Sequence, residues 1–119
     1  MFNQYDVLII GAGPAGMMAA IAAKTAGAGR VALIERNEKA GKKLYITGKG
    51  RCNLTNECEP AEFLKNVVSN PKFLTKAIWS FPPSAAIEFF GEQGLKLKTE
   101  RGKRVFPASD KSSDVIGVK

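Results

Sequence analysis

Three glycines and one acid near the start of the chain have the spacing of a chemical site. Gly11, Gly13 and Gly16 form a G-x-G-x-x-G pattern, and Glu35 follows Gly16 by 19 positions. In such a pattern the first glycine permits a tight turn, the second lets backbone N–H groups approach a phosphate, and the third lets a helix pack closely on strands. An acid about 20 residues farther on binds a ribose hydroxyl. The pattern therefore predicts a dinucleotide-binding site.

The residues around these positions supply the elements that such a site needs. Val7 to Ile10 and Val31 to Ile34 are short apolar runs typical of buried parallel strands, and Met17 to Ala26 contains no helix breaker. Pro14 suits the first helical turn, where its missing N–H costs nothing. Ala15 follows at the helix N-terminus, whose unpaired N–H groups attract phosphate. The glycine pattern is specific for dinucleotide binding when a strand, the glycine turn, a helix, a second strand and an acid follow one another in this order.

The acid also indicates which dinucleotide fits. A carboxylate at Glu35 favours a free 2′-hydroxyl and disfavours a 2′-phosphate. We therefore expect the adenosine half of FAD or NAD rather than that of NADP. The alternative is a βαβ unit whose glycines serve packing alone.

Composition is typical of a globular protein. The 119 residues suffice for one domain, with 45% hydrophobic and 24% charged residues. The net charge of +7 is spread along the chain, so we interpret it as solvated surface and phosphate steering and do not expect a nucleic-acid partner. The chain has no histidine and only two cysteines, which excludes a Cys/His zinc site and a histidine base.

An apolar and glycine-containing run from Val7 to Ala23 has the length of a signal or membrane segment. The residues before it carry no positive charge, and a glycine–proline turn interrupts it. We therefore expect a cytoplasmic protein without a membrane partner.

The segment 36–56 changes in character. It has four lysines or arginines between positions 42 and 51, together with Gly48, Gly50 and small polar residues. We expect a short helix at 41–45 and a loop at 47–50. The segment leaves the carboxyl end of the second strand, which is the edge where open α/β sheets bind ligands. A loop with these residues is better explained as a clamp over a cofactor than as an exposed basic loop.

Three strings in the chain resemble the BaiN-like family of FAD-dependent oxidoreductases, also called aminoacetone-oxidase-like flavoproteins: GAGPAGMMAA, LIERNEKAGKKLYITGKGRCNLTN and KRVFPASDKS. The resemblance covers essentially the whole chain, and GRCNLTN is its most specific string. It implies that FAD is held by the glycine pattern, by Glu35 and by the loop. Family members are longer, and they more often carry glycine where this chain has Lys49.

The resemblance also relates residues to parts of the cofactor. Lys42 and Lys43 correspond to a basic pair beside the adenosine and pyrophosphate, and Arg51, Cys52 and Asn53 correspond to a string near the flavin. FAD would act on a small-molecule substrate, with NAD as a candidate electron donor, and no catalytic residue is assigned. The expected cofactor-binding residues are Gly11, Gly13, Pro14, Ala15, Gly16, Glu35, Arg36, Lys42, Lys43, Arg51, Cys52 and Asn53.

Three other functions stay open. One is an NAD-binding module without flavin. Another is a flavin disulfide reductase using Cys52 and Cys58, but such enzymes place their cysteines closer together and follow them with a different string, so we expect Cys52 to pack in the loop and Cys58 to be incidental. The third is a nucleic-acid-binding flavoprotein. The lack of aromatic residues interleaved with the basic loop is evidence against this function.

The remainder of the chain has helical and then strand patterns. Residues 60–93 carry apolar residues at helical spacing, with Ser84 as a candidate cap, and we expect aromatics such as Phe73 and Trp79 to be in the core. Leu95 to Thr99 alternates strictly, and Arg104 to Phe106 returns after a turn, which predicts a hairpin. A helix start follows at 109–114.

We therefore expect an α/β fold: a Rossmann-like FAD-binding βαβ unit, a helical insert and a β-hairpin, forming an incomplete doubly wound domain. The expected parts are 1–58 for the βαβ unit and cofactor loop, 59–94 for the insert, and 95–119 for the hairpin and helix start. Two parallel strands give a poor core. We expect an N-terminal fragment, inactive alone, with exposed apolar strand edges that lead to self-association or partial disorder.

Overall fold

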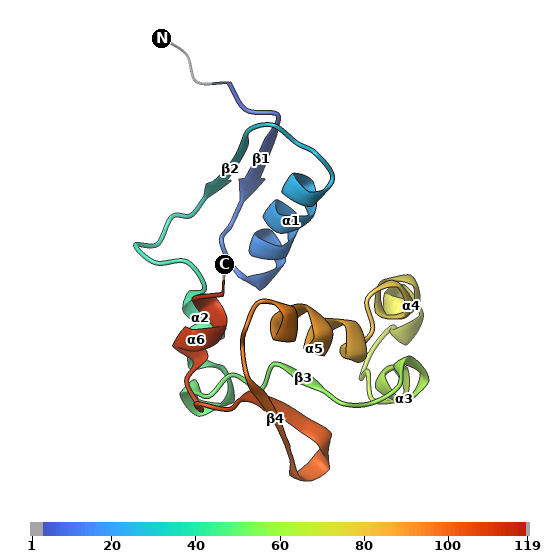
Figure 1. Ribbon diagram of the computed structural model, residues 1–119. Helices are drawn as coiled ribbons and strands as arrows, with labels where there is room; N and C mark the ends of the chain where they lie inside the picture. The colour runs from blue at the N-terminus through green and yellow to red at the C-terminus, as the bar shows by residue number, and fades with distance from the viewer. Residues whose placement is uncertain (1–3, 119) are drawn as a thin grey trace. The chain divides into compact units, whose positions relative to one another are not determined.

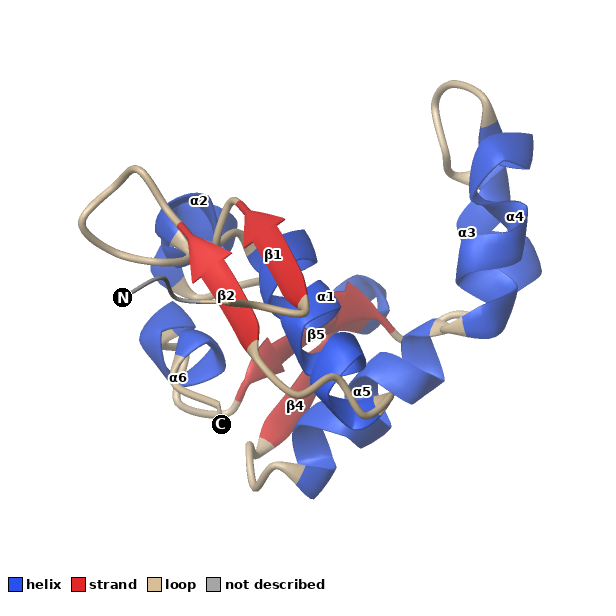
Figure 2. Ribbon diagram, turned by 90° about the horizontal axis from the view of Figure 1, so that it is seen from above, coloured by secondary structure: helices blue, strands red, loops and turns tan. Residues whose placement is uncertain are grey.

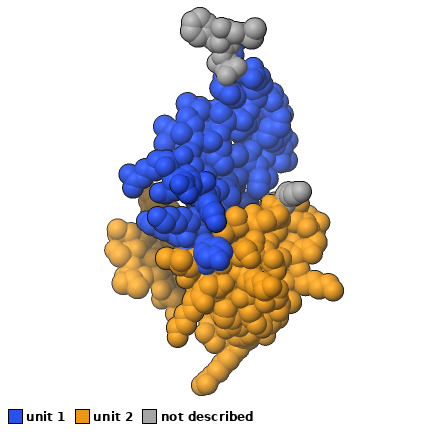
Figure 3. All heavy atoms as spheres, turned by 90° about the vertical axis from the view of Figure 1, so that its left-hand side faces the viewer, with its two compact units in different colours: residues 1–45 blue, residues 46–119 orange. Residues whose placement is uncertain are grey.

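The computed structural model describes residues 4–118 (Figure 1). The chain divides into two compact units, one within residues 1–45 and one within residues 46–119 (Figure 3). The first contains a βαβ arrangement, and the second contains helices and a small antiparallel sheet.

In the first unit, two parallel strands and their connecting helix form the predicted βαβ arrangement (Figure 2). Strand β1 (Val7–Ile10) pairs with β2 (Val31–Ile34) in register over all 4 residues of each. Helix α1 (Pro14–Thr25) joins the strands and packs against both. The predicted α/β arrangement of this unit is confirmed.

The sequence around α1 explains its two ends. Gly13 is the N-cap residue and Pro14 opens the helix, where proline has no N–H to leave unpaired. Ala26 is the C-cap, and Gly27 after it has a left-handed φ of 101°, which glycine adopts without strain. The helix therefore stops in time for the chain to return to β2.

A short helix and a tight loop follow β2. Helix α2 (Lys42–Ile46) confirms the predicted helix, and a 3₁₀ turn (Thr47–Gly50) follows it. Gly48 and Lys49 in this turn have left-handed φ angles of 55° and 58°. A Cβ on Gly48 would lie 2.7 Å from the backbone nitrogen of Asn53, so the loop closes on itself at this glycine.

Three helices begin the rest of the second unit, each with proline in its first turn: α3 (Pro60–Lys65), α4 (Pro71–Ser80) and α5 (Pro83–Glu92). The predicted cap at Ser84 is wrong. Pro82 is the N-cap residue of α5, because Pro83 already has the fixed φ that suits the first helical position.

A three-stranded antiparallel sheet completes the second unit. Strands β4 (Leu97–Glu100) and β5 (Arg104–Pro107) form the predicted hairpin, and β3 (Thr55–Asn56) pairs with the other side of β5. We did not predict β3, because two residues carry no readable periodicity. Helix α6 (Ser112–Ile116) contacts β5, and the buried core here includes Val105, Phe106 and Val115.

The aromatic residues of the helical segment are divided between core and surface. Phe89 and Phe90 are half-buried and meet edge to face, with ring centroids 5.1 Å apart. Phe73 and Trp79, however, are exposed. Our expectation of a core position is wrong for these two residues, because the half-buried face of α4 is formed by Leu74 and Ile78.

One face of the parallel strand pair is apolar and exposed. Ile9 lies on the α1 side, since its Cγ2 is 3.5 Å from a Cβ placed on Gly16. Strand alternation puts Leu8, Ile10 and Ile34 on the other face, where they are 55%, 84% and 50% exposed. We expected exposed apolar strand edges, and the exposed apolar residues described here lie on a face of the pair. In the described part of the chain, no helix is long and apolar enough to cross a membrane.

Candidate functional site

The glycine turn between β1 and α1 is shaped by two close approaches. Gly11 has a left-handed φ of 101°, and its N–H donates to the carbonyl oxygen of Ile34 at 2.7 Å. A Cβ on Gly16 would overlap the carbonyl oxygen of Gly11. Gly16 is therefore required for α1 to approach the end of β1, as the glycine pattern predicts.

Gly13 has a different environment. A Cβ built on this residue would meet no atom within 4 Å, so packing does not require a glycine here. No side chain caps the N-terminus of α1, and its first turn, with Pro14 and Ala15, contains no acidic residue. Unpaired N–H groups and the positive end of the helix dipole thus lie beside open space, which is suited to a phosphate.

Glu35 is held at the end of β2 by three hydrogen bonds. Its Oε1 accepts from the backbone N–H of Ala12 at 2.9 Å, and its Oε2 accepts from the backbone and side-chain nitrogens of Asn37 at 2.8 and 2.9 Å. A carboxylate has about four acceptor positions, so one remains for a ribose hydroxyl.

These bonds also favour the charged form of Glu35. The backbone N–H of Asn37, followed by that of Ala12, lowers the pKa of the carboxyl below its ordinary value. We did not predict a role for Asn37. The Glu-x-Asn spacing could have indicated this role, because a residue two positions after an acid can donate a hydrogen bond from its backbone N–H to the carboxylate.

The basic residues after β2 are exposed. Arg36 follows Glu35 directly, and its charge contributes to the lowered pKa of that carboxyl. Lys42 and Lys43 open α2 and are also exposed. The N–H of Gly41 donates to the carbonyl oxygen of Ala12 at 2.8 Å, which ties the start of α2 to the glycine turn. The first unit therefore brings the turn, the acid and the start of α2 together.

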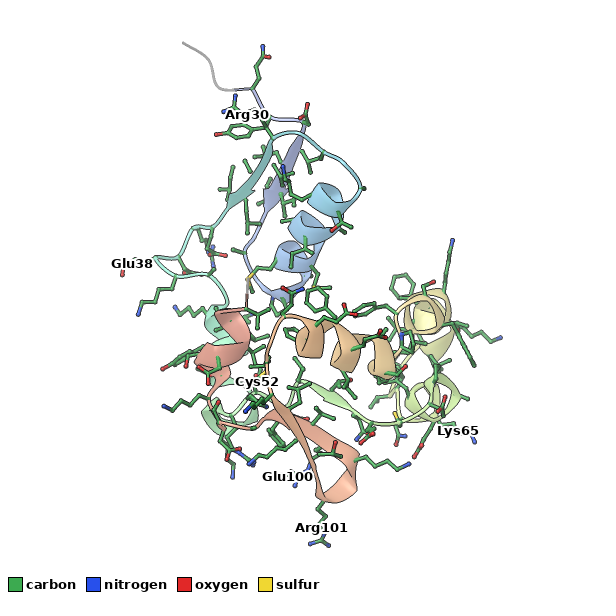
Figure 4. All side chains as sticks on the ribbon, viewed as in Figure 1. Arg30, Glu38, Cys52, Lys65, Glu100 and Arg101 are labelled. Carbon is green, nitrogen blue, oxygen red and sulfur yellow. The ribbon has the colours of Figure 1, made fainter. Side chains whose placement is uncertain are left out.

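Arg51 belongs to the second unit, where it is the centre of a charge network. Its Nε donates to Asp110 Oδ1 at 2.8 Å, its Nη2 pairs with Glu100, and its guanidinium lies 4.0 Å from the centroid of the Phe106 ring. Lys98 pairs with Asp110 at 2.7 Å and with Glu100 at 3.2 Å. Glu100 lies at the end of the β4–β5 hairpin (Figure 4). The network thus fixes the loop to the hairpin.

The network shifts the titration of its members. Hydrogen bonds from Arg51 and then Lys98 lower the pKa of Glu100, and hydrogen bonds from Lys98 and then Arg51 lower the pKa of Asp110. The two carboxylates in turn raise the pKa of Arg51. We did not predict these partners, because they lie 49 and 59 residues from Arg51 in sequence and no local pattern joins them.

The two cysteines are free thiols in the second unit. Cys52 is buried, and burial raises the pKa of its thiol. Cys58 is half-buried, and Asn53 is exposed. A buried thiol with a raised pKa forms little thiolate and is a poor nucleophile.

The geometry of the first unit agrees with comparisons to known proteins. The HI0933-like protein Rossmann domain matches residues 5–118. The chain belongs to this family. The predicted resemblance to BaiN-like oxidoreductases is thereby confirmed. The chain corresponds to a dinucleotide-binding portion of the proteins in this oxidoreductase family.

The chain matches part of the length of several curated relatives. The 3-dehydro-bile acid delta(4,6)-reductase of Clostridium scindens is 39% identical over 109 residues, covering 91% of this chain and 26% of the relative. The ribosomal RNA dihydrouridine synthase of Escherichia coli is 39% identical over 94 residues, covering 78% of the chain and 22% of the relative. The enzyme of the same name from Haemophilus influenzae is 37% identical over 96 residues, which are 78% of the chain and 23% of the relative. The chain thus spans about a quarter of the length of these relatives.

Proposed function

We propose that the chain is the FAD-binding portion of a flavin-dependent oxidoreductase. The observation that carries the proposal is the hydrogen bond from Ala12 to Glu35, because it joins the acid at the end of β2 to the glycine turn. A ribose-binding carboxylate and an uncapped helix N-terminus then belong to one small site. Membership of an oxidoreductase family supports the same function.

In this proposal each residue of the first unit has a defined task. The free acceptor position of Glu35 would receive a ribose hydroxyl, and the open space beside Gly13 would receive the pyrophosphate. Lys42 and Lys43 would neutralise phosphate charge. FAD, when bound, would supply hydride or electron transfer through its flavin ring.

The residues of the second unit have a supporting task in the proposal. Arg51 donates to two carboxylates, so its contribution would be to position the Gly50–Asn53 loop. Cys52 would pack that loop, as its burial indicates, and Asn53 next to it is exposed. The substrate we propose is a small molecule that meets the flavin ring.

The structure disfavours a disulfide reductase. A redox pair needs an accessible thiolate, whereas Cys52 is buried and its thiol pKa is raised. An NAD-binding module uses the same glycine turn and acid, so it has to be separated from our proposal by measurement.

Isothermal titration of the 119-residue chain with FAD, NAD and NADP tests the proposal. We expect FAD to bind more tightly than NAD, and NADP to bind weakest because its 2′-phosphate meets Glu35. Glu35→Ala should weaken FAD binding about tenfold or more, since a hydrogen bond to a charged acceptor is lost.

The matched control is Glu38→Ala, which removes an exposed acid from the same segment and should leave FAD affinity unchanged. Preference for NAD over FAD would replace the proposal with the NAD module. Equal losses in the two variants would show that Glu35 has no specific contact.

A further inference from the structure

The outward face of α4 combines aromatic rings with lysines. Phe73 is 85% exposed and Trp79 is 59% exposed. Lys76 lies three residues after Phe73 and three before Trp79, and Lys72 lies seven before Trp79. At helical spacing these side chains are neighbours on the side away from the half-buried face of the helix. We call Lys72, Phe73, Lys76 and Trp79 the α4 face.

The α4 face itself carries positive charge from Lys72 and Lys76, and helix α4 contains no acidic residue. Helix α3, which packs against α4, ends in Lys65 (Figure 4). At its other end the face meets acidic residues, since Trp79 lines a depression together with Glu57 and Glu59. Residues Ser69 to Leu74 line an open depression at the start of α4. The surface therefore offers flat apolar rings, nearby positive charge and a hollow.

We propose that the α4 face binds single-stranded nucleic acid. Bases stack on exposed aromatic rings, and phosphates pair with lysines beside those rings. Lys76 is one helical turn from each ring, so one strand can place bases on Phe73 and Trp79 with a phosphate between them. A bilayer-inserting face would keep its rings together without a central charge, whereas here the central residue is a lysine.

The proposal reverses one expectation from the sequence. We expected no nucleic-acid partner because the positive charge is spread along the chain, and we separately expected the aromatics of residues 60–93 to be in the core rather than on a stacking surface. The exposure of Phe73 and Trp79 removes the second expectation. The α4 face lies apart in sequence from the glycine turn, and the proposal does not depend on FAD binding.

Trp79 is the only tryptophan in the chain, so its fluorescence reports on the α4 face alone. The chain is titrated with an unstructured RNA of about 12 nucleotides. DNA of the same sequence and the corresponding duplex are titrated for comparison. We expect single strands to quench Trp79 emission by stacking and to bind more tightly than the duplex.

Two sets of variants separate the α4 face from general basic charge. Lys72→Gln with Lys76→Gln should weaken RNA binding and reduce the slope of log affinity against log salt by about 1.4, or about 0.7 for each lost phosphate contact. The control, Lys96→Gln with Lys111→Gln, removes the same charge from two exposed lysines elsewhere in the unit and should change neither value. Phe73→Ala should weaken binding about fivefold or more through lost stacking.

Several results would overturn the proposal. One is Trp79 emission that stays unchanged at saturating RNA. Another is an equal loss of RNA affinity in the control variant Lys96→Gln with Lys111→Gln, which would show that net charge alone explains the binding. A blue shift of Trp79 emission with anionic phosphatidylglycerol vesicles, without quenching by RNA, would indicate a membrane surface instead. A blue shift that grows with protein concentration alone would indicate contact with a second copy.

Discussion

At the scale of single residues, glycines of one motif are present for different physical reasons. Gly16 is required by packing, because any Cβ there would overlap the backbone of Gly11. Gly13 has open space around it, so its lack of a side chain matters only to something that approaches from outside. The two positions therefore allow packing and ligand binding to be tested separately.

Gly16→Ala should destabilise the chain by about 1–3 kcal/mol, the cost of overpacking against atoms that cannot move aside. Gly13→Ser is the matched variant: serine is a favoured N-cap residue, so stability should be kept while FAD binding weakens. Urea unfolding measures the first effect, and titration with FAD measures the second. Equal stability losses in both variants would contradict the division of roles.

Lys49 provides a second test at this scale. Its φ of 58° costs a side-chain-bearing residue about 1–2 kcal/mol. Lys49→Gly should raise the free energy of unfolding by about 0.5–1 kcal/mol once the greater flexibility of the unfolded chain is included. The control Lys76→Gly, within α4, should lower it by about 1 kcal/mol. A lower free energy of unfolding in Lys49→Gly would contradict the claim that the backbone of Lys49 is strained.

At the scale of elements, local patterns predicted more than long-range partners. The boundaries of β1 and β2, the proline that opens α4 and the β4–β5 hairpin follow from apolar runs, prolines and alternation. Strand β3 and the network around Arg51 could not be predicted in this way. Both depend on residues that are distant in sequence and meet only after folding.

The charge network should make the second unit sensitive to pH. The pKa values of Glu100 and Asp110 are lowered in the folded chain, so their stabilisation is complete above the pKa of the unfolded carboxyls, about 4, and is lost as the pH falls through the folded values. Glu100→Gln with Asp110→Asn should be less stable than the wild type at pH 7. The difference should narrow below about pH 4.

Urea unfolding of both proteins across this pH range checks the prediction. Glu35 also has a lowered pKa, but it is present in both proteins and cancels in the difference. High salt should shrink the difference at pH 7, because these groups are partly exposed. A difference independent of pH and salt would show that the substitutions act through packing rather than charge.

At the scale of the whole molecule, the exposed apolar face of β1 and β2 is its most unusual surface. Parallel strands are normally covered on both faces, whereas Leu8, Ile10 and Ile34 are exposed. The apolar character of the two parallel strands was readable from the sequence, and a parallel sheet of only two strands was expected in the described part of the chain. The exposure of Phe73 and Trp79 was not readable, because a helical pattern does not say which of its apolar residues find a neighbour.

The exposed strand face should cause self-association. The sedimentation coefficient of the chain should rise with concentration, and Ile10→Lys should suppress that rise because it places a charge on the face. Val68→Lys, at a fully exposed apolar residue of the second unit, is the control and should leave the rise unchanged. A wild-type chain whose sedimentation coefficient does not rise with concentration would contradict the prediction.

The central claim is that the glycine turn and Glu35 form the binding site for FAD. Backbone amide chemical shifts of the isotopically labelled chain, recorded while FAD is added, test it residue by residue. We predict that the largest changes fall on residues 11–13, 15–16 and 35–37, with α4 unaffected. Unchanged shifts in the glycine turn at saturating FAD, or changes confined to the second unit, would contradict the account.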